Sequence, residues 1–149
     1  MQKCVIFDVD GTLADCQHRV HWVRSKPKNW AAFNRGMSSD GVHQDVCDLL
    51  RMFHASGWTI LIATGRSEDD RAVTENWLGN VAGLGGLWTR LYMRASLDYR
   101  SDDVVKDEIL DQMIQDGFAP TVAIDDRNQV VNMFRNRGLR VLQVAPGDF

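Results

Sequence analysis

The sequence predicts an α/β fold: a doubly wound, Rossmann-like parallel sheet of five strands with helices on both faces. Two observations lead to this fold class. Short runs of apolar and β-branched residues alternate along the chain with helical patterns, and these runs are almost continuously apolar. Strands that are apolar on both sides are typical of a parallel sheet that helices cover on both faces.

Each element is predicted from its own pattern. The expected strands are Lys3–Phe7, Trp58–Ala63, Leu87–Met93, Thr121–Ile124 and Arg140–Val144. The expected helices have apolar residues at three- and four-residue spacing and are Val42–Ala55, Glu68–Asn80, Val104–Gln115 and Asn128–Asn136. Asp102 and Asp103 would cap the third of these helices. Because no repeat or linker interrupts this order, we expect one domain over residues 1–149.

Length, charge and cysteine content exclude several classes of protein. With 149 residues, 44% of them hydrophobic and 25% charged, the chain matches one globular domain and not a disordered or fibrous protein. Its net charge of −3 argues against binding to nucleic acid or membrane through bulk charge. We also expect no membrane span and no signal peptide, because no apolar run approaches about 20 residues and the first strand begins at Lys3. Three cysteines without a CxxC pair indicate reduced thiols in a cytoplasmic protein.

One segment does not follow the alternation of strands and helices. Cys16–Ser39 contains five arginines and lysines and no acidic residue, and aromatic side chains such as Trp22 and Trp30 lie among these cations. Two interpretations remain open. The segment is a surface insertion that packs its tryptophans on the sheet edge, or it is a basic surface that contacts a phosphorylated substrate. The span from Gly11 to Trp58 is short and already contains one helix, so we expect little or no cap over the site.

Polar residues follow three of the predicted strands, and ligands of open parallel sheets bind at these carboxyl ends. The polar groups are Asp8 and Asp10, Thr64-Gly65-Arg66, and Asp125 and Asp126. Four acids that meet at one edge would repel one another, and a hard divalent cation is the simplest compensation. We therefore predict that Asp8, Asp10, Asp125 and Asp126 hold Mg²⁺, which prefers oxygen ligands. Taken alone, each of these patterns is also compatible with a turn or a helix cap.

The spacing of these residues suggests chemical roles for them. Asp8 and Asp10 are two residues apart, so on an extended segment they point to the same side. One carboxylate can attack a phosphorus atom while the other, Asp10, acts as acid and then as base. Thr64 and neighbouring backbone N–H groups would contact phosphoryl oxygens. Lys106 would offset negative charge while Asp102, four residues earlier, holds it in place.

The ordered set Asp8-x-Asp10-Gly-Thr, Thr64, Lys106 and Asp125-Asp126 resembles the four motifs of the haloacid-dehalogenase superfamily. Asp10 is typical of the phosphatase branch. The stretches around Asp8, from Asp102 to Ile109, from Ala123 to Val131 and from Gln143 to Phe149 are similar to the phosphatase half of phage polynucleotide kinase/3′-phosphatases.

The resemblance implies a role for each matching residue. Asp8 would be the nucleophile and Asp10 the acid and base, with Thr64 and Lys106 also in the catalytic group. Arg19, nine residues beyond Asp10, would bind substrate together with Arg66, Gly65 and Asp102. Guanidinium groups suit phosphate oxygens for independent reasons, because their donors form a planar fork.

Several functions follow from this resemblance. The first is a Mg²⁺-dependent phosphatase with an aspartyl-phosphate intermediate that acts on 3′-phosphates of nucleic-acid ends or nucleotides, as in nucleic-acid repair. The alternatives are a small-molecule phosphatase such as a nucleotidase, and a phosphate-binding module without turnover. No GxxxxGK[ST] run occurs, so 5′-kinase activity is not expected. The oligomeric state is not predicted by any of these patterns.

Overall fold

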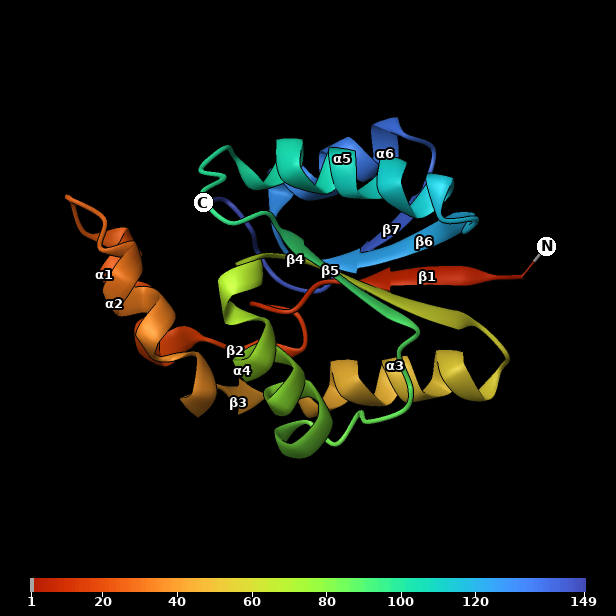
Figure 1. The fold of residues 1–149 in the computed structure, drawn as a ribbon, viewed down its shortest axis with the longest axis horizontal. Helices are drawn as coiled ribbons and strands as arrows, with labels where there is room; N and C mark the ends of the chain where they lie inside the picture. Colours follow the sequence, from red (N-terminus) through yellow and green to blue (C-terminus); the bar gives the residue numbers. More distant parts are fainter. Residues whose placement is uncertain (1) are drawn as a thin grey trace.

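The computed structural model describes residues 2–149, and its central sheet confirms the predicted fold class (Figure 1). The sheet order is β5-β4-β1-β6-β7, and every neighbouring pair is parallel. The strands of this sheet are β1 (Cys4–Phe7), β4 (Thr59–Ser67), β5 (Arg90–Arg94), β6 (Pro120–Asp125) and β7 (Arg140–Gln143). Each lies within a few residues of a run predicted to form a strand.

Helices cover both faces of the sheet. One face carries α3 (Gln44–Ala55) and α4 (Arg71–Asn76), and the other carries α5 (Asp102–Gln115) and α6 (Asn128–Asn136), as Figure 1 shows. The predicted helix Glu68–Asn80 forms in three pieces, because a 3₁₀ turn at Glu68–Asp70 precedes α4 and a π-helical turn at Trp77–Val81 follows it. None of the helices within residues 2–149 is long and apolar enough to cross a membrane.

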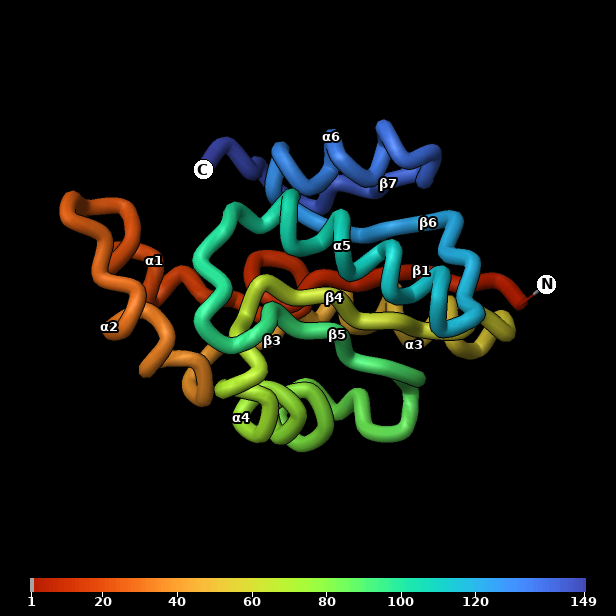
Figure 2. The backbone as a smooth tube through the Cα atoms, turned by 45° about the horizontal axis from the view of Figure 1, so that its top comes forward, coloured from red at the N-terminus to blue at the C-terminus, as the bar shows by residue number. Residues whose placement is uncertain are grey.

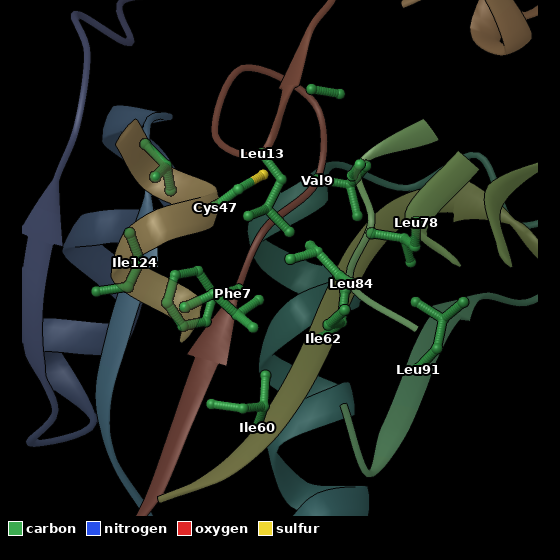
Figure 3. Close-up of a cluster of buried hydrophobic side chains, with 14 of the residues drawn as sticks. Phe7, Val9, Leu13, Cys47, Ile60, Ile62, Leu78, Leu84, Leu91 and Ile124 are labelled. Carbon is green, nitrogen blue, oxygen red and sulfur yellow. The ribbon is translucent and has the colours of Figure 1, made fainter. Parts of the chain in front are cut away.

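The core has two layers, one on each side of the sheet. Alternate residues of a strand point to opposite faces, so Phe7 and Ile62 pack toward α3 whereas Ile6 and Leu61 pack toward α5 and α6. Figure 3 shows the first layer, in which Phe7 is surrounded by side chains from β4, α3 and the segments around α4. The two layers bury β1 and most of β4, which explains why the sequences of these central strands are continuously apolar.

The basic segment forms a small helical hairpin, which the periodicity of the sequence did not reveal. Two short helices, α1 (Gln17–Arg24) and α2 (Trp30–Arg35), follow β2 (Ala14–Asp15) and precede a 3₁₀ turn, Met37–Ser39, and β3 (Gly41–Val42). The side chain that α1 buries is a cation, Arg19, so this helix has no apolar stripe. Figures 1 and 2 place the hairpin at the end of the sheet toward which the parallel strands point, where the C-terminus also lies. We expected little or no cap over the site, and the two short helices of this hairpin are what the structure places at that end of the sheet (Figure 1).

Candidate active site

The parallel register brings the predicted polar residues to one edge of the sheet. Phe7 of β1 pairs with Ile62 of β4 and with Ile124 of β6. Asp8 and Asp125 follow directly, and Thr64 follows one residue later, after Ala63. The Asp8 amide donates to the Ile124 carbonyl at 3.0 Å, which keeps the chain extended beyond the end of β1.

Three carboxylates gather at this edge. Asp8, Asp125 and Asp126 each offer an oxygen atom, and these atoms lie within 4.8 Å of one another. All three residues are buried, with at most 5% of their surface exposed. Lys106 of α5 donates from Nζ to Asp8 Oδ1 and to Asp125 Oδ2, both at 2.8 Å. Three negative charges and one positive charge leave the cluster at −2, which is the charge that one divalent cation neutralises.

The pKa shifts of this cluster reflect its excess of negative charge. Burial and the neighbouring Asp125 raise the pKa of Asp8 well above its usual value, although Lys106 acts in the opposite direction. Burial and Asp125 also raise the pKa of Asp126 to about 6. Burial alone would lower the pKa of Lys106, but Asp125 and Asp8 outweigh it and raise that pKa, so the ammonium stays charged. The cluster therefore favours the binding of a further positive charge.

Asp10 was predicted as a fourth metal ligand, but its carboxylate does not lie with these three and contacts two arginines instead. Its carboxylate accepts hydrogen bonds from Arg66 Nη2 at 2.6 Å and from Arg19 Nη2 at 2.7 Å. Burial would raise the pKa of Asp10, but Arg66 and Arg19 together outweigh it and lower that pKa. The two carboxylates of the Asp8-x-Asp10 pair thus lie in opposite electrostatic surroundings.

Arg19 and Arg66 are close to Asp10, but the structure does not show them as open substrate-binding groups. Only 1% of each side chain is exposed. Besides Asp10, both guanidinium groups contact Asp40: Arg19 Nε and Nη2 donate to it at 2.7 Å and Arg66 Nη2 donates at 3.0 Å. Arg66 also donates from Nη1 to the Thr74 hydroxyl at 3.1 Å. In this structure the two arginines hold the carboxylates of Asp10 and Asp40 in place.

Asp40 is a site residue that the sequence analysis missed. Its side chain is fully buried, and besides the two arginines it contacts His18 Nε2 at 2.8 Å. Its carbonyl oxygen accepts a hydrogen bond from the buried Trp77 Nε1 at 2.9 Å. Asp40 therefore ties the hairpin to the sheet. One signal in the sequence points to it, because Asp40 is the first acidic residue after the long acid-free stretch Cys16–Ser39.

Three further residues lie at the site and contact its other members: Thr12, Thr64 and Gly65. The Thr64 hydroxyl accepts a hydrogen bond from the Arg66 amide at 3.1 Å, and the Thr12 hydroxyl donates to Asp8 Oδ2 at 2.9 Å. Gly65 has no room for a side chain, because a Cβ there would collide with the Asp102 carboxylate. The chain approaches this closely only because residue 65 is a glycine.

Asp102 does not hold Lys106 by a hydrogen bond, although the spacing of four residues predicted this pair. Its two oxygens accept hydrogen bonds from Arg94 Nη2 and, at 2.9 Å, from Arg127 Nη1. Arg94 also donates from Nε to the Gly65 carbonyl at 2.7 Å. Asp102 acts on Lys106 only through its charge, as one of the groups that raise the Lys106 pKa. Arg94 and Arg127 are thus further site residues that the sequence analysis did not place.

Known proteins are similar to this chain in sequence and in fold. The model of the polynucleotide kinase PNKP phosphatase domain matches residues 2–149. Two solved structures of a Pnkp1/Rnl/Hen1 complex contain chains that are 32% and 31% identical to this one, with TM-scores of 0.83 and 0.79. Both alignments cover 100% of this chain but only 48% and 44% of the other, so this chain spans about half the length of those relatives.

A more distant protein shares the fold. The class C acid phosphatase from Bacillus anthracis is 14% identical, with a TM-score of 0.69 over 98% of this chain and 67% of its own. The family model covers nearly the whole chain. The chain therefore belongs to the family of polynucleotide kinase PNKP phosphatase domains and is a phosphatase of the haloacid-dehalogenase type.

Proposed function

We propose that this phosphatase removes 3′-phosphates from nucleic-acid ends, with Asp8 as the nucleophile and Mg²⁺ as the cofactor. The observation that carries the proposal is the contrast between Asp8 and Asp10. Only Val9 separates the two residues, but Asp8 lies in an acidic cluster with Lys106 whereas Asp10 is held by two arginines.

The residues present fit a divalent cation. Two unit charges 4.8 Å apart repel by about 3.5 kcal/mol at an effective dielectric constant of about 20, and Lys106 neutralises only one of the three carboxylates. Asp8, Asp125 and Asp126 offer only oxygen atoms, the ligand type that Mg²⁺ prefers. When bound, Mg²⁺ would neutralise charge on the phosphoryl oxygens.

The proposed chemistry has two displacements. In the first, an Asp8 oxygen forms a bond to phosphorus, the bond from phosphorus to the 3′-oxygen breaks, and Asp10 gives its proton to that oxygen. In the second, Asp10 takes a proton from water, the water oxygen attacks phosphorus, and the bond to Asp8 breaks to release inorganic phosphate. Lys106, at 2.8 Å from Asp8, keeps the nucleophile oriented and offsets its charge.

Asp10 must be protonated before it can act as an acid, and we expect the bound substrate to favour this protonation. Without substrate, Arg19 and Arg66 hold Asp10 in its charged form. A phosphoryl group beside Asp8 would bring negative charge next to Asp10, which favours its protonated form. Once the leaving group has gone, the same arginines suit the charged form that activates water.

The substrate class rests on the family and on local charge. The similar chains come from Pnkp1/Rnl/Hen1 complexes, one of which is described as an RNA repair complex. In this chain the hairpin beside Asp10 carries five basic and no acidic residues between Cys16 and Ser39, although the whole chain has a net charge of −3. This favours a polyanionic end over a small phosphate ester.

Phosphate release from matched oligonucleotides tests the proposal. A 3′-phosphorylated strand should be hydrolysed well and a 5′-phosphorylated strand of the same sequence poorly, with activity lost in EDTA and restored by Mg²⁺. Asp8→Asn should abolish turnover, whereas Asp111→Asn, at an exposed ion pair with Arg137, should not. Equal rates on both strands, or faster turnover of mononucleotides, would favour the nucleotidase. Phosphate binding without any turnover would favour the binding module.

A further inference from the structure

We propose that the helical hairpin of residues 16–39 binds the single strand whose 3′ end enters the site, through exposed cations and tryptophan rings. This inference rests on the proposed function, because it takes the end of a strand as the substrate. It adds the place where the strand lies. Among residues 2–149, the hairpin combines three features: unpaired positive charge, two partly exposed tryptophans and a connection to Asp10.

The first observation is unneutralised positive charge. Four cations of the hairpin are exposed, and within residues 2–149 none has a carboxylate at ion-pair distance; they are Arg24, Lys26, Lys28 and Arg35. Elsewhere most arginines are paired, as those at positions 51, 71, 90, 94, 100, 127 and 137 show. An acidic chain has carboxylates available for such pairs, so a cluster of free cations suits an external polyanion.

The second observation is the exposure of two tryptophans. Trp22 is 41% exposed and Trp30 is 51% exposed, which excludes the interpretation that both rings pack fully on the sheet edge. The Lys28 ammonium lies 5.6 Å from the centre of the Trp30 ring. The His21 ring lies 4.7 Å from that of Trp22. An aromatic face with a cation beside it offers what a single strand presents, a flat base next to a phosphate.

The third observation is a chain of contacts from the exposed surface to the site. The Trp30 ring meets Phe33 edge to face, with 5.6 Å between ring centres. Phe33 in turn packs under the Arg19 guanidinium, whose carbon lies 4.2 Å from the ring centre. Arg19 Nη2 then contacts Asp10 at 2.7 Å. A base stacked on Trp30 would therefore be connected through two side chains to the proposed acid and base.

The location agrees with these contacts. In Figures 1 and 2 the hairpin stands at the end of the sheet toward which β1 runs. Asp8 follows directly after the last residue of β1, Phe7, so it lies at this same end. Residues 127–147 form another acid-free segment with several arginines, but two of these, Arg127 and Arg137, are ion-paired with carboxylates. An anionic membrane is a different class of partner, and its negative charge would also be attracted to these cations. We favour the strand because flat, partly exposed rings beside a phosphatase site match bases next to a terminal phosphate.

Direct binding tests the cations. The full chain is titrated into a fluorescently labelled single strand that ends in a 3′-hydroxyl, and anisotropy is measured at several salt concentrations. The variant Arg24→Gln/Lys26→Gln/Lys28→Gln/Arg35→Gln should bind at least about 10-fold more weakly and lower the salt slope by up to about 2.8, or about 0.7 per lost phosphate contact. Lys3→Gln/Arg140→Gln removes two exposed cations from the amino end of the sheet and should bind like wild type.

Substitution of one ring tests stacking. Trp30→Ala should weaken binding by about 5- to 150-fold, while Trp30→Phe, which keeps a flat ring, should recover most of the affinity. Ile114→Ala removes a side chain that is 53% exposed on α5 and serves as the matched control. In kinetics, Trp30→Ala should raise KM for a 3′-phosphorylated strand several-fold more than KM for p-nitrophenyl phosphate.

Three results would overturn the inference. One is strand affinity and salt slope unchanged in both hairpin variants. Another is an equal loss on the strand and on p-nitrophenyl phosphate, which would show that the hairpin shapes the site instead of binding the strand. The last is hairpin-dependent binding to vesicles of phosphatidylserine and phosphatidylcholine without binding to the strand. Because the binding assay uses a 3′-hydroxyl end, it gives an answer even if no 3′-phosphate is hydrolysed and the proposed function fails.

Discussion

Asp40→Asn should lower both stability and kcat, although Asp40 contacts no predicted motif residue other than the two arginines. The side chain is 0% exposed and receives hydrogen bonds from Arg19 Nε and Nη2 at 2.7 Å and from Arg66 Nη2 at 3.0 Å. Asparagine keeps the size but removes the charge, and one of its two polar atoms becomes a donor that faces other donors. Two buried guanidinium groups would then share Asp10 alone.

The magnitude follows from the burial of this cluster. Breaking one side of a buried ion pair costs about 3–5 kcal/mol, because a charge stays buried without its partner. We expect the free energy of unfolding to fall by about 3 kcal/mol, since Asp10 still neutralises part of the arginine charge. For a chain of 149 residues this corresponds to a decrease in Tm of about 6–12 °C.

Two measurements test this prediction. Urea unfolding should show the loss of stability, and steady-state kinetics on a 3′-phosphorylated strand should show kcat falling more than about 10-fold with a smaller change in KM, because Asp10 loses its fixed orientation. Asp48→Asn, which removes one side of an exposed pair with Arg51, is the control and should change stability by less than about 1 kcal/mol. If Asp40→Asn keeps wild-type stability and kcat, the arginines do not depend on Asp40 and the reasoning is wrong.

Three further predictions concern the acidic cluster and one titrating side chain. Gly11→Ala should lower stability by more than about 1 kcal/mol and weaken Mg²⁺ binding, because φ at residue 11 is +81° and a Cβ there would collide with Asp126; urea unfolding and calorimetric titration measure the two effects. Mg²⁺ should raise the Tm of the wild type by binding only the folded state, and Asp125→Asn should remove most of that increase in a thermal scan. Burial and Asp116 raise the pKa of Tyr92 to about 12, so its contribution to stability is present below about pH 10 and is lost as the pH rises through 12; Tyr92→Phe should flatten this part of the curve of unfolding free energy against pH.

The sequence was sufficient to predict the sheet and most of its helices because both depend on local patterns. Buried parallel strands are continuously apolar, and α3 or α6 repeats its apolar residues every three or four positions. The same method could not find α1, because the residue that this helix buries is Arg19. Its partners, Asp10 and Asp40, come from other parts of the chain. A buried charge is recognised only when its partner is known, and that is a tertiary property.

The candidate site shows the same division. The order of motifs along the chain was enough to predict that Asp8, Lys106, Asp125 and Asp126 meet, and the structure brings them together. The orientation of Asp10 was not predictable from its spacing, since two arginines draw its carboxylate away from the acidic cluster. Spacing limits which side chains can meet, but competition among several charged partners decides which contacts form.

Asp102 allows this distinction to be measured, because sequence spacing and structure name different partners for it. A double-mutant cycle between Asp102→Ala and Arg94→Ala should give a coupling energy of about 0.5–3 kcal/mol in unfolding experiments, since the two side chains are in contact and mostly buried. The cycle between Asp102→Ala and Lys106→Ala should give a smaller value, because only charge at a distance links that pair. A larger coupling to Lys106 than to Arg94 would show that the helical spacing of four residues, and not the contact between α5 and β5, determines what Asp102 stabilises.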